Sequence, residues 1–375
     1  MNFDFQLILN ILLYAFYGVG GIQILYYSFF FSRIIFLKTK KKEDGNTPPV
    51  TVIICAKNEL ENLQKNLPSI LEQNYPQYEV IVVNDNSQDG SNDFLSHLKS
   101  QYAHLKVIDI LQESRTFKGK RLALGLGLKG AKNEWCLLTD ADCAPAGSNW
   151  LNKMQRNFRA PKEIVLGYAP HLKQAGFLNK CIRFETFFTA FQYINLALSG
   201  LPYMGVGRNM AYKKQFYFDN KGYMPQSDMI SGDDDLFINK VASGKNTRIE
   251  IDSATFMYSM PKLTWQNWFL QKRRHISTGS KYKKIHKWLL GLQSISQFLF
   301  YVLLMVLLVF KFQWQIVMLI FGVRFLLQAV DYAVAMRRFK EADLFWLFPI
   351  WDVLQVVYNI ILLPSLFKKP SLQWK

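Results

Sequence analysis

The chain has 375 residues, of which 50% are hydrophobic and 19% charged, and its formal net charge is +17. A charged fraction below the roughly 25% of typical soluble domains excludes collagen-like, low-complexity and wholly disordered chains, and the length suffices for one large or two ordinary domains. Its cysteines, Cys55, Cys136, Cys143 and Cys181, form no C-x-x-C pair, which argues against a zinc ribbon or a disulfide framework. We therefore expect reduced thiols in a cytosol-facing protein.

The first segment predicts a membrane anchor. Residues 5–32 contain no charge over 28 positions, enough to cross a hydrocarbon core of about 30 Å. The start MNFDF lacks the basic region of a signal peptide, and the apolar run is too long for one. Because Arg33 and further lysines follow directly, the next segment is expected in the cytosol. We predict an anchor over 1–37 and a polar linker over 38–49.

A soluble α/β domain is predicted next, over residues 50–260. Four β-rich runs have the character of buried parallel strands: residues 50–56, 79–85, 105–110 and 134–142. Between the first two, residues 59–72 carry leucine and isoleucine at helical spacing. A strand, a helix and a strand within about 35 residues form a βαβ unit, so a parallel sheet is expected.

The C-terminal third is apolar again and predicts membrane helices over 288–367, followed by a tail over 368–375. Residues 288–310 are uncharged for 23 positions, whereas the later apolar segments carry Arg324, Asp331 and Asp352. Charges inside a membrane helix pair with one another or face the bundle interior, and we favour this interpretation over a substrate role. The side of the membrane on which the tail lies stays open.

The placement of the positive charge favours membrane lipids over nucleic acid as partners. Residues 253–330 hold ten Lys and Arg and no acidic residue, and much of this charge directly precedes an apolar segment. Basic clusters beside hydrophobic spans are typical of the cytoplasmic face of a membrane protein. We therefore predict a basic interfacial segment over 261–287. The aromatic residues of 184–193 are likewise expected on an interfacial helix surface.

Acidic residues collect at the ends of the predicted strands. Asp85 ends one strand, Asp140 and Asp142 end another, and residues 233–235 form an acidic triplet. Ligands of open α/β sheets bind outside the carboxyl ends of the strands. Carboxylates gathered there repel one another unless a cation lies among them, and their oxygens suit Mg²⁺ or Mn²⁺.

The glycine patterns argue against two other enzyme classes. No G-x-x-x-x-G-K-S/T and no G-x-G-x-x-G directly follows the first predicted strand. The segment GVGRN at residues 205–209 comes too late in the chain and has the wrong spacing. ATPases and dinucleotide-dependent dehydrogenases are therefore disfavoured.

A strand-end Asp, a D-x-D, an acidic cluster and a Q-x-x-R occur in this order over residues 50–282, and the combination resembles the family 2 glycosyltransferases. The resemblance implies an α/β GT-A domain that binds a nucleotide-diphospho-sugar, with N-terminal and C-terminal transmembrane helices. It also implies nucleotide contacts at Ala56, Asn58, Glu59, Asp85, Lys120, Asp140, Gln271 and Arg274. Lys118 or Arg121 could replace Lys120, Asp85 could instead cap a helix near Ser91, and lipid contact competes for Arg274.

The same resemblance implies the remaining site residues. Asp142, together with Asp140, is expected to bind Mg²⁺ or Mn²⁺ on the sugar diphosphate, and Asp234, with Asp233 beside it, is the expected general base. In the Q-x-x-R-W motif His275 stands in place of the tryptophan, which argues against processive synthesis.

The expected function is inverting transfer of a sugar from a nucleotide-diphospho-sugar to a lipid-linked or lipid-like acceptor at the cytosolic face of the cell membrane. One base and no enzyme nucleophile imply a single displacement, and a metal would stabilise the departing diphosphate. Uridine is the commonest base in donors of this family. A small processive polysaccharide synthase and a non-catalytic membrane scaffold that retains the fold remain as alternatives.

Overall fold

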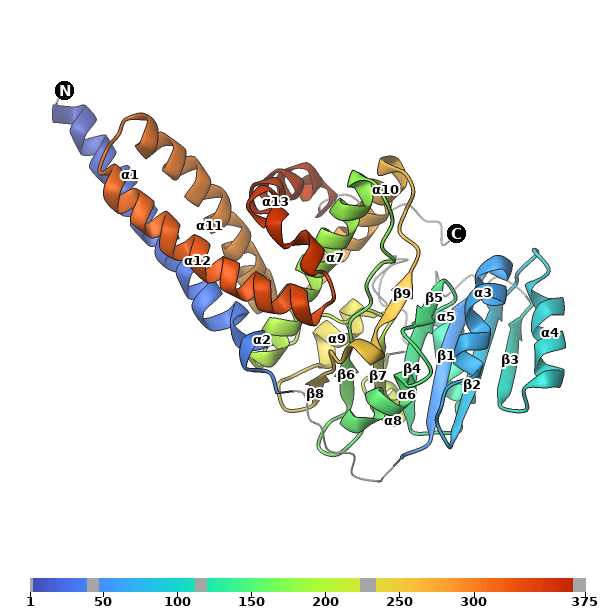
Figure 1. Ribbon diagram of the computed structural model, residues 1–375. Helices are drawn as coiled ribbons and strands as arrows, with labels where there is room; N and C mark the ends of the chain where they lie inside the picture. Colours follow the sequence, from blue (N-terminus) through green and yellow to red (C-terminus); the bar gives the residue numbers. More distant parts are fainter. Residues whose placement is uncertain (1–2, 39–46, 112–119, 223–233, 367–375) are drawn as a thin grey trace. The chain divides into compact units, whose positions relative to one another are not determined.

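The computed structural model describes residues 3–38, 47–111, 120–222 and 234–366 (Figure 1). The chain divides into two compact units. The α/β unit comprises Lys38–Lys281 and Ser365–Lys375, and the helical unit comprises Met1–Leu37 and Tyr282–Pro364.

The α/β unit is built on a seven-stranded sheet with the strand order β3-β2-β1-β4-β7-β6-β8. The strands are β1 (Val50–Ala56), β2 (Tyr78–Asp85), β3 (Leu105–Ile110), β4 (Trp135–Asp140), β6 (Ile164–Leu166), β7 (Met210–Lys213) and β8 (Thr247–Ile249). Strands β3, β2, β1 and β4 run parallel, β7 runs antiparallel to both of its neighbours, and β6 pairs parallel with β8. A second, antiparallel sheet joins β5 (Cys143–Pro145) to β9 (Met257–Ser259). The predicted α/β fold and the parallel arrangement of β1, β2, β3 and β4 are confirmed, whereas the sheet as a whole is mixed because β7 runs antiparallel.

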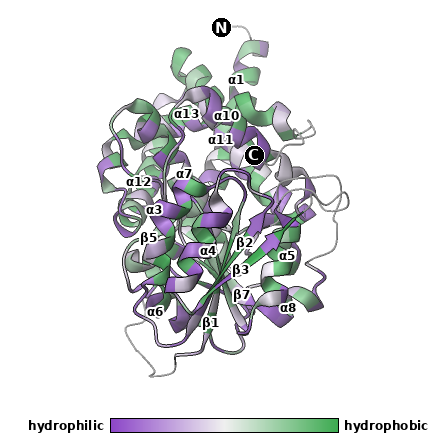
Figure 2. Cartoon of the chain, turned by 90° about the vertical axis from the view of Figure 1, so that its right-hand side faces the viewer, coloured by the Kyte–Doolittle hydropathy of each residue, from purple (hydrophilic) through white to green (hydrophobic). Residues whose placement is uncertain are grey.

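The core follows from the two-residue period of the strands. Val52 and Ile54 of β1 belong to the same buried cluster as Leu63 and Leu67 of α3 (Leu60–Leu71). Ile53 points to the opposite face, where a Cβ on Gly127 of α5 (Arg121–Gly130) would lie 2.7 Å from its side chain. The sheet is therefore covered on both faces, which explains why β1 is buried at every position. Figure 2 shows the corresponding contrast between hydrophobic central strands and outer helices of mixed hydropathy.

The α/β unit contains further helices, some of which carry residues of the candidate site. They are α4 (Ser91–Gln101), α6 (Trp150–Met154), η2 (Gln155–Asn157), α7 (Phe177–Leu198), α8 (Lys214–Asp219), α9 (Asp235–Val241), η3 (Ser253–Thr255), α10 (Trp265–Ile276) and η4 (Ser277–Lys281). Of these, α9 begins at Asp235 of the acidic triplet, α10 contains the Q-x-x-R motif, and η4 follows that motif directly.

The prediction of an interfacial surface on residues 184–193 is wrong, because α7 is a buried helix. Phe184, Phe187, Phe188 and Phe191 are each at most 5% exposed. These four phenylalanines share one helical face, and Ile182, Thr186 and Tyr193 on the opposite face are buried as well, so α7 is packed on more than one side. They contribute core packing instead of a surface for lipid.

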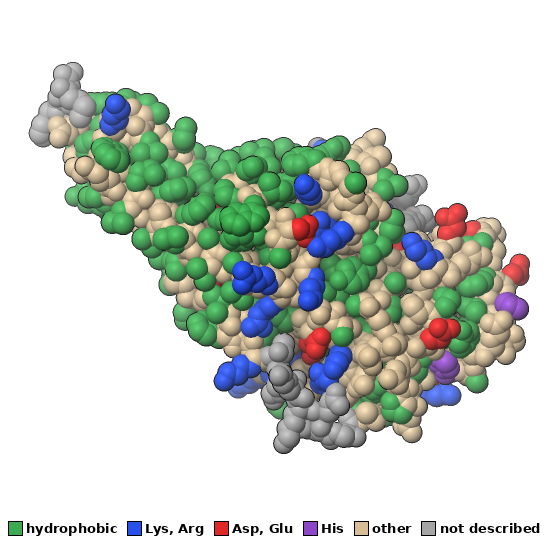
Figure 3. All heavy atoms as spheres, in the orientation of Figure 1, with side chains coloured by type: hydrophobic (Ala, Val, Ile, Leu, Met, Phe, Trp, Pro, Cys, Tyr) green, Lys and Arg blue, Asp and Glu red, His purple; other side chains and the backbone are tan. Residues whose placement is uncertain are grey.

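Among the residues that the structure describes, four segments are long and apolar enough to cross a membrane: Asp4–Phe36, Lys284–Val309, Trp314–Arg338 and Ala342–Leu366. They are built from α1 (Phe3–Leu25), η1 (Tyr26–Phe31), α2 (Arg33–Phe36), α11 (Lys284–Val309), α12 (Trp314–Arg338), η5 (Ala342–Leu347), α13 (Phe348–Leu362) and η6 (Leu363–Leu366). Figure 3 shows that hydrophobic side chains dominate their visible surface. The predicted N-terminal and C-terminal membrane helices are therefore present as helices of suitable length and composition.

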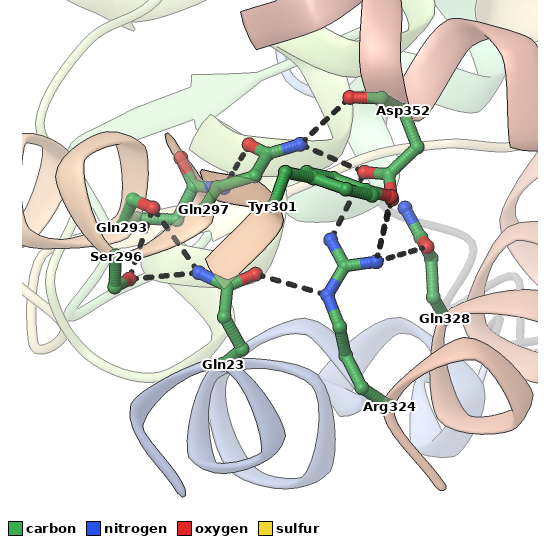
Figure 4. A network of polar contacts seen from close by, with 8 residues as sticks. All are labelled: Gln23, Gln293, Ser296, Gln297, Tyr301, Arg324, Gln328 and Asp352. Carbon is green, nitrogen blue, oxygen red and sulfur yellow. Dashed lines mark hydrogen bonds and ion pairs between the residues drawn. The ribbon is translucent and has the colours of Figure 1, made fainter. Parts of the chain in front are cut away.

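A buried polar network joins these helices (Figure 4). Arg324 of α12 binds both carboxylate oxygens of Asp352 of α13, through Nη1 at 2.5 Å and Nη2 at 3.0 Å. Its Nε donates to Gln23 of α1, and Gln297 of α11 donates to Asp352 at 2.7 Å. The predicted pairing of intramembrane charges is therefore confirmed for Arg324 and Asp352, whereas Asp331, also buried, lies outside this network.

Candidate active site

The strand register brings the predicted nucleotide-binding residues to one edge of the sheet. In the ladder between β1 and β2, Ala56 lies opposite Asn84, directly before Asp85. In the ladder between β1 and β4, Cys55 lies opposite Asp140. Ala56, Asp85 and Asp140 thus end three adjacent parallel strands at the same carboxyl edge, the usual place for a ligand of an open α/β sheet.

Hydrogen bonds join the loops that follow β1 and β2. Asn58 has a φ of +52°, its backbone N–H donates to Ser87 Oγ at 2.9 Å, and its Oδ1 accepts from the Gln88 N–H at 2.8 Å. A φ in the left-handed region is tolerated by asparagine better than by most residues. Glu59, the next residue, accepts a hydrogen bond from Asn62. Asn58 and Glu59 are therefore held in a defined loop beside the sheet edge.

The carboxylate at the start of α4 is that of Asp89. Asp89 Oδ1 accepts the backbone N–H of Ser91 at 3.1 Å and its hydroxyl at 2.6 Å, and Oδ2 accepts the Leu60 N–H at 2.8 Å. Burial alone would raise the pKa of Asp89, but these hydrogen bonds outweigh it and lower the pKa. The helix-capping role that was the alternative for Asp85 is thus filled by Asp89.

Lys120 lies between two predicted site carboxylates. Its Nζ is 2.5 Å from Asp140 Oδ1 and 4.0 Å from Asp234 Oδ2. Burial alone would lower the pKa of Lys120, but Asp140 and then Asp234 outweigh it and raise the pKa well above its usual value. Lys120 is therefore a fixed positive charge at the sheet edge. Lys118 lies outside the described residues.

The two D-x-D carboxylates offer the donor set of a divalent cation. Burial raises the pKa of Asp142, as does the like charge of Asp140, while the guanidinium of Arg208 lowers it. A cation beside these two carboxylates would relieve both effects. No group of three or more His, Cys, Asp and Glu that could hold a metal occurs among the described residues. The pair fits Mg²⁺ or Mn²⁺, which keep water and phosphate oxygens as further ligands.

Asp234 is partly buried, with 23% of its side chain exposed, and is positioned by Gly207. Burial raises the pKa of Asp234, Lys120 opposes this shift, and the backbone N–H of Gly207 donates a hydrogen bond to the carboxylate. A Cβ at Gly207 would lie 1.7 Å from Asp234 Oδ2, so only glycine permits this approach. Oδ1 is buried and has no hydrogen-bond partner within the described ranges. Asp233, the predicted neighbour of this base, lies outside the described residues.

The GVGRN segment therefore contributes to the site, although its place and glycine spacing in the sequence did not predict such a role. Arg208 donates from Nη1 to Ser259 Oγ and from Nη2 to the Ala169 carbonyl at 3.0 Å. Ser259 Oγ is also 3.0 Å from Nδ1 of the buried His171. The only sequence signal for this role was a glycine-rich turn that carries a cation directly before a short strand.

Asn209 anchors that turn. Its Oδ1 accepts from Trp150 Nε1 at 3.1 Å, and its Nδ2 donates to the carbonyls of Tyr168 and Thr255, both at 2.7 Å. The side chain is fully buried, so its three hydrogen bonds fix the backbone that carries Gly207 and Arg208.

Gln271, Arg274 and His275 lie on neighbouring positions of α10, since residues three and four apart share a helix face. The Arg208 charge contributes to lowering the pKa of His275, which places this helix near the GVGRN turn. Just beyond the helix, Thr278 Oγ1 donates to Asp235 Oδ2 at 2.6 Å. This contact joins the segment after the Q-x-x-R motif to the acidic residues at the start of α9.

Comparisons with known proteins agree with this geometry. Residues 51–218 match the family model described as Glycosyl transferase family 2. The chain is 29% identical over 144 residues to the poly-beta-1,6-N-acetyl-D-glucosamine synthase of Staphylococcus epidermidis, covering 37% of this chain and 32% of that protein. It is 32% identical over 108 residues to the glycosyltransferase AglE of Haloferax volcanii, covering 28% of this chain and 34% of that protein. The aligned stretch thus spans about a third of the length of these curated relatives.

A solved structure shows the same fold. The mannosyltransferase PcManGT of Pyrobaculum calidifontis, in complex with GDP-Man and Mn²⁺, superposes with a TM-score of 0.58 at 19% sequence identity. The match covers 94% of this chain and 98% of PcManGT. The fold is therefore that of the GT-A glycosyltransferases, as the sequence predicted.

Proposed function

We propose that the chain, whose residues 51–218 match the family model described as Glycosyl transferase family 2, is an inverting glycosyltransferase. It moves a sugar from a nucleotide-diphospho-sugar to a lipid-linked or lipid-like acceptor. The observation that carries the proposal is the position of Lys120 between Asp140 and Asp234, which brings the first D-x-D carboxylate and a partly buried potential base together at the carboxyl edge of the sheet.

The donor binds along that edge. Ala56, Asn58, Glu59 and Asp85 line the nucleoside, because they end β1 and β2 or follow directly in the adjoining loop. Lys120, Gln271 and Arg274 approach the diphosphate, whose negative charge suits an ammonium and a guanidinium. PcManGT, which shares the fold, was solved with GDP-Man and Mn²⁺. For this chain we favour a UDP-sugar.

Asp140 and Asp142 would hold Mg²⁺ or Mn²⁺, which would supply positive charge to stabilise the departing diphosphate. The chain's own contribution is to keep both carboxylates at the end of β4 and to place Lys120 against Asp140. Arg208 adds a second cation on the Asp142 side.

Asp234 accepts the proton of the attacking acceptor hydroxyl. Its raised pKa makes it a stronger base than an exposed aspartate. Its Oδ1 accepts no hydrogen bond from the described residues. Asp233 stands beside it in the sequence and assists. Since no enzyme nucleophile is required, the sugar transfers in one displacement with inversion.

The acceptor is lipid-linked or lipid-like, and the α/β unit lies at the cytosolic face of the cell membrane. Two features support this proposal: four apolar helices of membrane-spanning length, and the short basic connection from the end of α10 at Ile276 to the start of α11 at Lys284. Basic residues next to a span suit anionic lipid on the cytoplasmic side.

A small processive polysaccharide synthase is the second candidate, favoured by the similarity to the Staphylococcus epidermidis synthase. His275 in place of a tryptophan argues against it. A non-catalytic scaffold is disfavoured, because it has no need of two D-x-D carboxylates, Lys120 and Asp234 at one edge.

Two variants separate the proposed roles. Asp142→Ala should abolish metal-dependent donor turnover. Asp234→Ala should keep metal-dependent donor binding, but its rate of transfer should fall by about 10²–10⁴-fold, the usual contribution of a general base. The exposed Asp93→Ala on α4 is the matched control. Donor binding is measured by calorimetry and transfer by chromatography of the product. Transfer by Asp234→Ala at the wild-type rate would remove Asp234 from its role, and a ladder of products would favour the synthase.

A further inference from the structure

A buried serine hydroxyl joins Arg208 to His171 in the α/β unit. Ser259 of β9 is 2% exposed and His171 is 7% exposed. Arg208 Nη1 donates to Ser259 Oγ, which lies 3.0 Å from His171 Nδ1. The backbone keeps Ser259 and His171 together, because the Ser259 N–H donates to the Pro170 carbonyl at 3.2 Å and the Ser259 carbonyl accepts the Leu172 N–H at 2.9 Å. The side chains of Arg208, Ser259 and His171 therefore form a continuous chain of hydrogen bonds.

The chemistry of the three groups fixes the direction of this chain. A guanidinium only donates hydrogen bonds, so the Ser259 oxygen must accept from Arg208. Within the described ranges, His171 Nδ1 is the only group left to take the single proton of the Ser259 hydroxyl. Nδ1 is therefore the unprotonated nitrogen of a neutral ring. This agrees with the pKa of His171, which burial and then the Arg208 charge hold well below its usual range.

Two contacts hold the guanidinium beside the D-x-D loop. Besides Ser259, the Ala169 carbonyl accepts from Arg208 Nη2 at 3.0 Å. Ser259 lies opposite Cys143 in the ladder between β5 and β9, and facing Cα atoms of antiparallel strands are about 4.5–5.5 Å apart. Cys143 directly follows Asp142 and donates from Sγ to its Oδ1 at 3.3 Å. The anchor of Arg208 is thus one strand away from the proposed metal ligand Asp142.

The positive charge of Arg208 is not neutralised by its anchors. Both of them are neutral acceptors, and the partly buried side chain forms no ion pair with the part of the chain that the structure describes. A contact that served packing alone would need a donor but no charge, and a charge withdrawn from water without a counter-charge costs free energy. The arrangement therefore favours binding of an anion, and the anion expected beside Asp142 is the diphosphate of the donor.

We propose that His171 and Ser259 are positioning residues that hold the Arg208 guanidinium toward the diphosphate as it departs. His171 takes the Ser259 proton, which turns a lone pair of the Ser259 oxygen toward Arg208. A cation fixed in this way stabilises the charge that develops on the leaving group without having to reorganise during the reaction. The inference rests on the proposed glycosyltransferase function and adds to it two residues that act through Arg208.

The first test is a double-mutant cycle between Ser259 and Arg208, with the full chain in lipid nanodiscs. Calorimetry measures the affinity for UDP or GDP, whichever the wild-type protein binds with Mn²⁺. Ser259→Ala should weaken this affinity about tenfold, the effect of loosening one charge-assisted contact. In the Arg208→Met background the same substitution should change the affinity by less than about twofold, because Ser259 acts through Arg208.

The second test starts from the other end of the chain and does not require Ser259→Ala to fold. His171→Leu removes the acceptor of the Ser259 proton and should weaken nucleotide binding as Ser259→Ala does. His171→Asn offers a side-chain oxygen in its place and should restore most of the affinity. The exposed Ser100→Ala on α4 is the control and should leave the affinity unchanged. Thermal unfolding establishes that each variant is folded.

Three outcomes would overturn the inference. Wild-type affinity in Ser259→Ala would show that Arg208 does not depend on the hydroxyl, and an equal loss with and without Arg208 would assign Ser259 to the fold alone. Equal affinities of His171→Asn and His171→Leu would remove His171 from the chain. If the wild-type protein binds the nucleotide and releases diphosphate from a sugar donor while these variants match it, only this inference fails. If it neither binds nor releases, the proposed function fails as well.

Discussion

Gly207 sets how closely the GVGRN turn approaches Asp234. The carboxylate receives the Gly207 N–H and lies where a side chain at this position would begin, with a Cβ only 1.7 Å from Oδ2. The carboxylate would therefore have to move before any larger residue fitted. The position of the proposed base Asp234, and the hydrogen bond that supports it, thus depend on Gly207.

Gly207→Ala should lower the transfer rate by about 10²-fold, because a base displaced by about 1 Å loses its alignment with the acceptor. Donor binding in the presence of Mn²⁺ should change little, since the D-x-D carboxylates belong to β4 and its following loop. Steady-state kinetics and calorimetry measure the two quantities. Gly147→Ala, where an added Cβ meets nothing within 4 Å, is the control. Equal effects of the two substitutions would contradict the assigned role of Gly207.

Individual site residues differ in how far the sequence could predict them. Asp85, Asp140 and Asp142 could be predicted, because strand ends can be recognised from hydrophobic runs and ligands bind at the carboxyl edge of a parallel sheet. Arg208 was not, because its importance comes from the approach of residues 169 and 259, which no local pattern reports. Gly207 was missed for the same reason, since its contact is with a residue 27 positions later.

At the level of elements, the sequence predicted the strands and membrane helices well and misjudged α7. Buried parallel strands and membrane helices have long apolar runs that are recognisable locally. An aromatic helix next to such segments can face lipid or the protein core, and composition does not separate these cases. The burial of Phe187 and Phe191 shows that the core is the correct location.

The helical unit depends on the ion pair between α12 and α13. Asp352→Leu leaves the buried Arg324 without its carboxylate, and removing one partner of a buried pair costs about 3–5 kcal/mol. The double variant Arg324→Leu and Asp352→Leu leaves no unpaired charge, so it should be more stable than Asp352→Leu alone. Thermal unfolding in detergent micelles measures this order, with the exposed Arg337→Gln as control. A double variant less stable than the single one would contradict the account.

Across the whole molecule, the basic residues behind the net charge of +17 occur in two kinds of surroundings. Part of it flanks apolar segments, as the sequence predicted from its placement. Another part lies in the α/β unit, where Arg208 lowers the pKa of Asp142 at the candidate site, and where Arg208, Lys262 and Arg274 add to the effect of burial in lowering the pKa of His275. Sequence alone predicted only the first, because the second depends on how residues of distant segments come together.

The central claim is metal-dependent transfer from a nucleotide-sugar, and release of nucleoside diphosphate tests it most directly. The full chain in lipid nanodiscs is offered UDP- and GDP-sugars with Mn²⁺ or Mg²⁺, with and without a total lipid extract, beside the Asp234→Ala variant. We predict release from one donor that increases with lipid, stops when the metal is chelated and is lost in the variant. Neither binding nor release with any donor and metal would contradict the enzyme assignment and favour a scaffold.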